Sequence, residues 1–243
     1  MTRLSADISQ STQSEGRRVV IFDIDHTLLD TFDAQNRALN AMMQSLFGVP
    51  ADLRTLEGSG AGRMTYDIIV EILRAHGISE HRIRNQLCTA VGRLADELQL
   101  RLSTPDPTTR VLPGVPDVLE VLSRVSPLGV ISGNPECIAA LNLEWADLRK
   151  YFSIESFARP GISRAHLIKT VLETASARAK VEVVGIMVGD SRSDVSSART
   201  AGVHAIGVTT GTHSRVELLE AGAELVLDTL VELPSAVAML TRK

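Results

Sequence analysis

The sequence predicts an α/β protein, with a doubly wound parallel sheet as its core and an α-helical cap subdomain inserted after the first strand. Short apolar runs recur along the chain, and each precedes a segment with helical spacing. One long region, residues 32–110, shows helical patterns and no good strand candidate. Polar side chains, mostly aspartates, stand directly after several of the apolar runs.

The apolar runs suit strands that are buried on both faces, as in a parallel sheet. We expect strands at 19–22, 128–131, 183–188, 205–208 and 225–227. Helices are expected at 135–146, 164–174, 193–201, 214–221 and 230–240, which completes the alternation of a doubly wound sheet. We interpret residues 18–31 and 111–243 as the core domain and the polar residues 1–17 as a disordered arm.

Within residues 32–110, the runs ALNAMMQSLF, TYDIIVEILRAHG and IRNQLCTAVGRLADELQL all have helical spacing. The segment STPDPTTRVLPGVP then resembles a linker that returns the chain to the core. A helical subdomain in this place would act as a lid over whatever the strand ends bind.

Composition excludes several classes of protein. The net charge is −4, aromatics make up 3% of the residues, and no basic patch is interleaved with aromatics, which argues against nucleic acid or an anionic membrane as partner. No apolar run approaches the ~20 residues of a membrane span. Cys88 and Cys137 lie far apart without CxxC spacing, so we expect neither a disulfide framework nor a zinc site, and a cytoplasmic location fits.

Ligands of open parallel sheets bind beyond the carboxyl ends of the strands. Three such ends carry polar residues: Asp23 and Asp25 after the first strand, Ser132, Gly133 and Asn134 after the second, and Asp190 and Asp194 after the third. The basic segment ARPGISRAHLIK lies between the last two groups. Packing alone does not explain such a set.

The four aspartates would repel one another and raise one another's pKa. A hard divalent cation such as Mg²⁺, which prefers oxygen ligands, removes this conflict. Ser132 and the amides around Gly133 would donate to phosphate oxygens, and a basic residue would add charge. The pattern therefore indicates a phosphoryl-transfer site.

The motifs DIDHT, ISGN and GDSRSD, in this order, resemble the signature motifs of the haloacid dehalogenase superfamily. The resemblance runs from Arg18 to the carboxyl end. A helical cap between the first and second motifs resembles the phosphoglycolate-phosphatase-like branch. The resemblance implies a Rossmann-like core and a hydrolytic or phosphoryl-transfer activity.

By this resemblance, Asp23 would be the nucleophile that forms an aspartyl-phosphate. Asp25 would be the general acid and then the general base, and Thr27 would brace the turn. The resemblance also implies that Mg²⁺ is held by Asp23, the backbone carbonyl of Asp25, Asp190 and Asp194. Ser132, Gly133 and Asn134 would bind the phosphoryl group, with Asn134 either orienting Asp25 or capping the following helix.

The family's third motif is usually a lysine, which is absent here. Arg164, Lys169 and Arg159 are the candidates, and Arg164 fits best because it opens a predicted helix. An arginine would bind phosphate through two donors. His26 replaces a commoner glycine, and its side chain should point away from the aspartates, toward the hinge of the cap.

In the cap, the loop GSGAGRMTYD either brings Arg63 and Thr65 over the site or simply begins a helix at Thr65 with Arg63 in solvent. Tyr66 stands where the family phrase usually carries an acidic residue. The substrate-binding part of the cap therefore differs from the family pattern.

Asp25 selects the reaction, because dehalogenases of the superfamily lack an aspartate there. We expect a Mg²⁺-dependent phosphomonoester hydrolase that acts on a small phosphorylated metabolite, with phosphoglycolate as the first candidate by resemblance. A sugar phosphomutase and a non-catalytic phosphate-binding protein are the alternatives. Both a monomer and a homodimer are compatible with the sequence.

Overall fold

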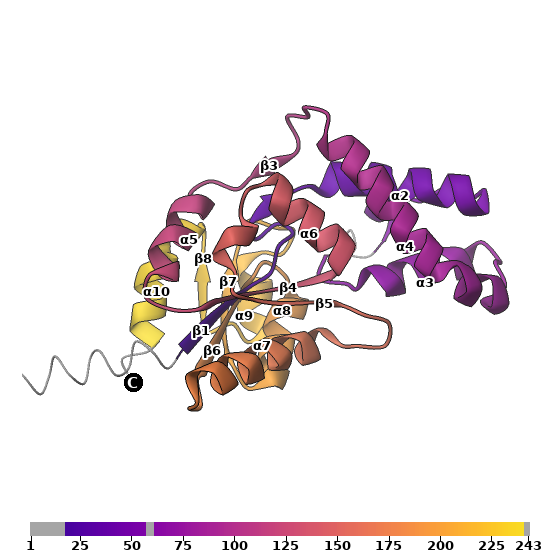
Figure 1. Cartoon of the computed structure of the whole chain (residues 1–243). Coiled ribbons are helices and arrows are strands. Elements are labelled where there is room, and N and C mark those ends of the chain that lie inside the picture. The colour runs from indigo at the N-terminus through magenta and orange to yellow at the C-terminus, as the bar shows by residue number, and fades with distance from the viewer. Residues whose placement is uncertain (1–17, 57–60, 241–243) are drawn as a thin grey trace, which may run out of the picture.

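The structure is a computed structural model that describes residues 18–56 and 61–240. The predicted amino-terminal arm, residues 1–17, lies outside the described residues. A central sheet with helices on both faces carries a group of further helices at one end (Figure 1). None of the described helices is long and apolar enough to cross a membrane.

The central sheet contains six parallel strands in the order β5-β4-β1-β6-β7-β8. In chain order the strands are β1 (Arg18–Phe22), β4 (Leu128–Pro135), β5 (Ile154–Ala158), β6 (Val184–Gly189), β7 (His204–Val208) and β8 (Leu225–Leu227). Strand β1 lies between β4 and β6, with Val20 opposite both Leu128 and Ile186. The ends of these three strands therefore meet at one edge, where the strand order reverses.

The expected doubly wound α/β fold is confirmed, but one strand of the central sheet was not predicted. Strand β5 lies at the edge of the sheet and has the sequence IESFA, which is not a continuous apolar run. Glu155 and Ser156 interrupt its apolar pattern, although four of its five residues are buried. Strand β4 also extends beyond the predicted end at 131, with a shift of register between Ser132 and Pro135.

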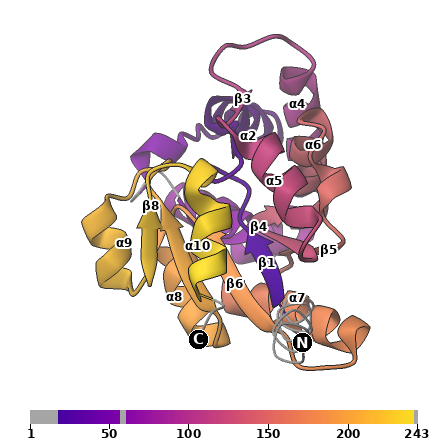
Figure 2. The same ribbon diagram turned by 90° about the vertical axis from the view of Figure 1, so that its left-hand side faces the viewer.

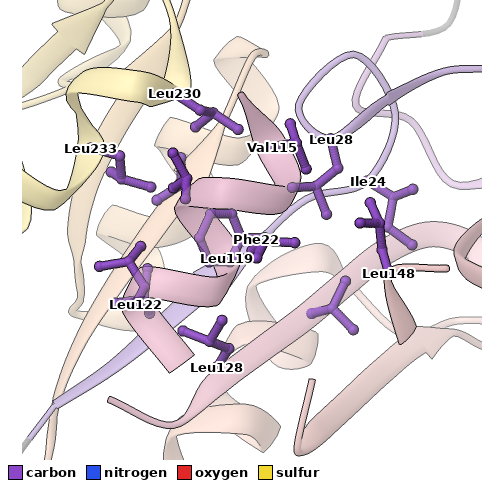
Figure 3. Close-up of a cluster of buried hydrophobic side chains, with 14 of the residues drawn as sticks. Phe22, Ile24, Leu28, Val115, Leu119, Leu122, Leu128, Leu148, Leu230 and Leu233 are labelled. Carbon is purple, nitrogen blue, oxygen red and sulfur yellow. The ribbon is translucent and has the colours of Figure 1, made fainter. Parts of the chain in front are cut away.

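Alternate residues of β1 serve two hydrophobic clusters on opposite faces of the sheet. Val20 and Phe22 belong to the cluster under α5 (Val115–Ser123), α6 (Glu136–Trp145) and α10 (Leu233–Leu240), while Val19 and Ile21 face α7 (Arg164–Ala179), α8 (Arg192–Ala201) and α9 (Arg215–Ala221). Figure 2 shows α5 and α10 next to each other on the first face. In Figure 3, Phe22 and Leu119 lie inside this cluster.

The predicted linker, residues 103–116, extends too far at its carboxyl end, because α5 begins at Val115. Gly114 precedes the helix with φ of 76°, which favours glycine, and Pro116 occupies its first turn, where the missing N–H costs little. The predicted helix at 230–240 is a 3₁₀-helix, Leu230–Glu232, followed by α10. Helix α7 continues to Ala179, beyond the predicted end at 174.

The inserted region contains α2 (Phe32–Phe47), the 3₁₀-helix η1 (Leu53–Thr55), α3 (Thr65–Ala75) and α4 (Glu80–Leu102). These helices share a hydrophobic cluster of their own, which includes Met42, Ile69 and Leu98. Ile138 of α6 joins this cluster, so the inserted helices rest against the core. They stand at the upper right of Figure 1.

Two short strands connect the inserted helices to the core. Strands β2 (Leu29–Asp30) and β3 (Arg110–Val111) form an antiparallel pair in which Asp30 lies opposite Arg110. The two side chains also form an ion pair, Arg110 Nη2 to Asp30 Oδ2, over 2.9 Å. The two passages of the chain between core and insert are thereby held together.

Candidate active site

The loop after β1 directs two carboxylates into one cavity. The strand ends at Phe22, so Asp23 and Asp25 stand beyond it rather than on it. Ile24 is fully buried in the hydrophobic cluster, while both aspartates line the cavity. The amide of Leu28 donates to the Ile24 carbonyl over 2.9 Å, which holds the turn. Ile24 is thus separated from the two aspartates by a turn and not by the alternation of the strand.

Asp23 belongs to a buried cluster of acidic groups. One carboxylate oxygen from each of Asp23, Asp190 and Asp194 lies within 4.8 Å of the others. Arg164, the first residue of α7, donates to Oδ1 of Asp23 and, over 2.6 Å, to Oδ1 of Asp194. All four residues are buried, so the cluster holds three carboxylates and one guanidinium away from water.

Burial and charge shift the pKa values of this cluster. Burial raises the pKa of Asp23 well above its usual value; Arg164 lowers it, and the neighbouring Asp194 and Asp190 raise it further. Burial also raises the pKa of Asp190 well above its usual value, and Asp194 adds to the shift. Although its own burial opposes the charge, the carboxylates of Asp194 and Asp23 raise the pKa of Arg164. The cluster therefore has more negative charge than its single cation neutralises.

The donor set of this cluster fits a hard divalent cation. Asp190 Oδ1 accepts a 3.3 Å hydrogen bond from Thr27 Oγ1, but the buried Oδ2 has no hydrogen-bond partner among the described residues. A buried, unpaired carboxylate oxygen costs free energy unless a cation meets it. Oxygen ligands of this kind are those that Mg²⁺ and similar ions prefer. The side chain of Asp25 is not part of this cluster.

Asp25 has a separate set of partners. Asn134, at the end of β4, donates from Nδ2 to Asp25 Oδ2 over 2.9 Å. Gln35 of α2 donates to Asp25 Oδ1, and Thr31 Oγ1 lies 3.4 Å from the same oxygen. Burial raises the pKa of Asp25, while His26 and the hydrogen bond from Gln35 lower it. The carboxyl group is thus held by residues of both the core and the inserted helices.

The two alternatives for Asn134 can now be distinguished. Its side chain donates to Asp25, and the residue that precedes α6 is Pro135, with no side-chain cap.

The two alternatives for the cap loop GSGAGRMTYD each hold in part. Thr65 begins α3 and also donates to Asn134 Oδ1 over 2.6 Å, whereas Arg63 is 30% exposed and forms an ion pair with Glu71.

Among the basic candidates, Arg164 is the one that meets the aspartates. Arg159 and Lys169 are both exposed, while Arg164 is buried between Asp23 and Asp194. Ser163 caps α7 by accepting from the amide of His166, which places Arg164 at the first turn of the helix. The sequence favoured Arg164 but did not exclude Arg159 and Lys169.

The residues of the motif ISGN do not all line the cavity. Gly133 lines the cavity, and a Cβ there would lie 2.3 Å from the backbone oxygen of Arg63, so only glycine fits. Ser132 is fully buried and does not line the cavity; its Oγ accepts from the amide of Asn134 over 3.0 Å. Its role toward a phosphoryl group stays a prediction.

The prediction for His26 holds only in part. Its backbone has a φ of 58°, so regular alternation does not apply. The ring lies 5.9 Å from that of Phe32 and its Nδ1 lies 3.9 Å from Asp30 Oδ1, which places it at the cap hinge as expected. It also borders the same cavity as Asp25, contrary to the prediction that it points away.

Gln35 and Thr31 did not emerge from the sequence. They stand four residues apart at the start of α2, and Gln35 Nε2 also donates to Thr31 Oγ1 over 2.8 Å. Their spacing shows that they share a helix face. Nothing local shows that this face meets the loop after β1.

The chain is similar in sequence to a family of known proteins. The chain matches the family model described as haloacid dehalogenase-like hydrolase over residues 20–208. It is 29% identical over 226 residues to phosphoglycolate phosphatase 1 from Pseudomonas aeruginosa, covering 89% of this chain and 78% of that protein. It is 28% identical over 228 residues to the phosphoglycolate phosphatase from Synechococcus elongatus, covering 93% and 100%.

Solved structures agree on the fold. A protein predicted to be a phosphoglycolate phosphatase, from Haemophilus somnus, has a TM-score of 0.70 at 15% identity and covers 91% of this chain and 98% of that one. A protein from Thermotoga maritima, provisionally assigned as a β-phosphoglucomutase, has a TM-score of 0.62 at 24% identity, covering 92% and 99%. At these identities the likeness shows the fold.

Proposed function

Because the chain belongs to the family of haloacid dehalogenase-like hydrolases, we propose that it is a Mg²⁺-dependent phosphatase that hydrolyses phosphomonoesters of small metabolites. The main support is that Asp23 and Asp25 line one cavity but accept hydrogen bonds from different residues, Asp23 from Arg164 and Asp25 from Asn134. Two carboxylates in different environments can divide the work of nucleophile and acid between them. The names of the curated relatives support the same reaction.

In the first half of the reaction, a carboxylate oxygen of Asp23 attacks phosphorus and the ester P–O bond breaks. Asp25, whose pKa burial raises, donates its proton to the departing oxygen. In the second half, Asp25 removes a proton from water as the water attacks phosphorus. The bond from phosphorus to Asp23 then breaks, and inorganic phosphate leaves.

Arg164 favours the ionised form of Asp23, because it lowers a pKa that burial raises, and directs the carboxylate by a charge-assisted hydrogen bond. Asp23, Asp190 and Asp194, with the backbone carbonyl of Asp25, would hold Mg²⁺, which supplies positive charge for the transferring phosphoryl group when bound. Gly133 and Asn134 line the adjacent wall, and the buried Ser132 supports them by accepting from the amide of Asn134. The cap, residues 32–110, would close over the substrate and exclude bulk water.

The test is release of inorganic phosphate from a panel of phosphomonoesters, with and without Mg²⁺. We expect metal-dependent release that Asp23→Asn abolishes. Asp147→Asn is the matched control, because Asp147 is an exposed aspartate that is paired with Lys150 and does not line the cavity. Equal release from wild type and a correctly folded Asp23→Asn would contradict the nucleophile.

The same panel separates the two alternatives. A sugar phosphomutase would retain the phosphoryl group and release little phosphate from simple esters. A non-catalytic binding protein would bind phosphate or Mg²⁺ without turnover that depends on Asp23. Rapid, Asp23-dependent release of phosphate from several esters contradicts both.

A further inference from the structure

The cavity over the strand ends has two chemically different walls. One wall, contributed by the core, carries Asp23, Asp25, Asp190 and Arg164 beside Gly133. The remaining lining is mostly apolar, although Gln35, Arg63 and Thr65 also belong to it. Its apolar wall consists of Leu39 of α2, Leu53 of η1, Ile68 of α3, Leu94 and Leu98 of α4, and Ile138 of α6.

The basic side chains that line the cavity already have partners. Arg164 is bonded to Asp23 and Asp194 on the core wall. Both terminal nitrogens of Arg63 face the carboxylate of Glu71 on α3. His26 lies beside Asp30. Residues 57–60, which the structure does not describe, have the sequence EGSG and add no basic side chain.

A phosphomonoester that places its phosphoryl group against the core wall directs its alcohol portion toward the apolar wall. A carboxylate in that position would lose its water without gaining a cation, which is unfavourable. A hydrocarbon group in the same place gains from leaving water.

We propose that the preferred substrates are phosphomonoesters whose alcohol portion is compact, uncharged and mainly hydrocarbon, rather than an anionic alcohol such as glycolate. This proposal rests on the phosphatase function proposed above. The cavity, which is partly open, measures about 90 Å³ and therefore favours a compact alcohol. The apolar wall, defined by the six residues above, determines this preference.

The decisive comparison uses isobutyl phosphate and 2-phosphoglycolate at a fixed Mg²⁺ concentration. The two esters have the same branched shape, but two methyl groups of the first replace the carboxylate oxygens of the second. We expect kcat/KM for isobutyl phosphate to exceed that for 2-phosphoglycolate at least tenfold. The reverse order, at either pH 6.5 or pH 8, would overturn the proposal.

Two variants test the physical cause. Leu53→Lys introduces a cation on the apolar wall, and Leu53 is only partly buried, so the lysine can be accommodated. We expect it to shift the ratio of the two kcat/KM values at least tenfold toward 2-phosphoglycolate, while circular dichroism and the melting temperature report folding. An unchanged ratio in a folded variant would count against the apolar wall as the cause.

Arg63→Gln tests the competing view that Arg63 leaves Glu71 to bind a substrate carboxylate. We expect this variant to change kcat/KM of both esters by the same factor. Arg74→Gln is the matched control, since Arg74 is an exposed arginine of α3, the helix that carries Glu71, and is paired with Glu80. A selective, tenfold loss with 2-phosphoglycolate in Arg63→Gln alone would overturn the proposal.

The failure of this inference differs from the failure of the proposed function. Phosphate release that depends on Asp23 and favours 2-phosphoglycolate overturns the substrate class alone. Absence of release from every ester tested, by a folded protein with Mg²⁺, overturns the phosphatase and the substrate class together.

Discussion

The side-chain amide of Asn134, at the end of β4, donates to Oδ2 of Asp25, in the loop after β1, over 2.9 Å. The other end of the same amide accepts from Thr65 Oγ1, on the first residue of α3. One asparagine therefore connects an inserted helix to the carboxyl group proposed as acid and base. A movement of α3 that breaks the contact between Thr65 and Asn134 therefore changes the support of Asp25.

Replacing Asp25 removes the proposed proton donor. We expect Asp25→Asn to lower kcat about 10²–10⁴-fold for alkyl phosphates, whose leaving oxygen needs a proton. For 4-nitrophenyl phosphate, whose leaving group is stable as an anion, the loss should be much smaller. Steady-state kinetics on both esters measures this difference, and equal losses would contradict the role of Asp25 as an acid.

Gln35 should act as a positioning residue for Asp25, because its side chain donates to Asp25 Oδ1 from α2. We expect Gln35→Ala to lower kcat about tenfold for alkyl phosphates and less for 4-nitrophenyl phosphate, following the pattern of Asp25→Asn on a smaller scale. Gln44→Ala is the control, since Gln44 is an exposed glutamine of the same helix. A loss with no dependence on the leaving group would indicate only a structural role.

Mg²⁺ should stabilise the folded protein by neutralising the acidic cluster. We expect the melting temperature to rise on addition of Mg²⁺ and this rise to shrink in Asp190→Asn, whose loss of charge should itself stabilise the metal-free protein. The pKa of Asp190 is raised, so protons compete with the cation more strongly as pH falls. The Mg²⁺ concentration that gives half of the maximal rise in melting temperature should therefore be higher at pH 6 than at pH 8. An unchanged concentration would contradict a carboxylate site.

Arg164 should be essential to the stability of the fold as well as to the reaction. Arg164→Ala leaves Asp23 and Asp194 buried without their cation, and we expect a loss of about 3–5 kcal/mol in the free energy of unfolding. Arg164→Lys keeps the charge but lacks the two-pronged geometry, so it should be less destabilised while still losing activity.

Arg178→Ala provides the control for the loss of an arginine from α7. Arg178 lies at the exposed end of this helix and donates to the Ser153 carbonyl over 2.8 Å. Denaturant unfolding of the three variants should place Arg178→Ala near the wild type. Equal stability of Arg164→Ala and the wild type would show that the buried ion pairs contribute nothing.

The parts of the fold that the sequence predicts are those with local signals. The central strands are predictable because they are buried on both faces and read as continuous apolar runs. The edge strand β5 has one neighbour and carries Glu155 and Ser156, so its pattern is weak. The helix α5 was hidden because Gly114 and Pro116, residues typical of a turn, also begin a helix.

The sequence by itself determined which residues stand at the strand ends: Asp23, Asp25, Gly133, Asn134 and Asp190 are adjacent to apolar runs, and adjacency is a property of the chain. Only the tertiary structure decided which distant side chains meet them. The choice of Arg164 over Lys169, the donation from Gln35 to Asp25, and the apolar wall opposite the aspartates all depend on how helices turn against the sheet. That orientation follows from the packing of whole hydrophobic clusters, which no short stretch of sequence encodes.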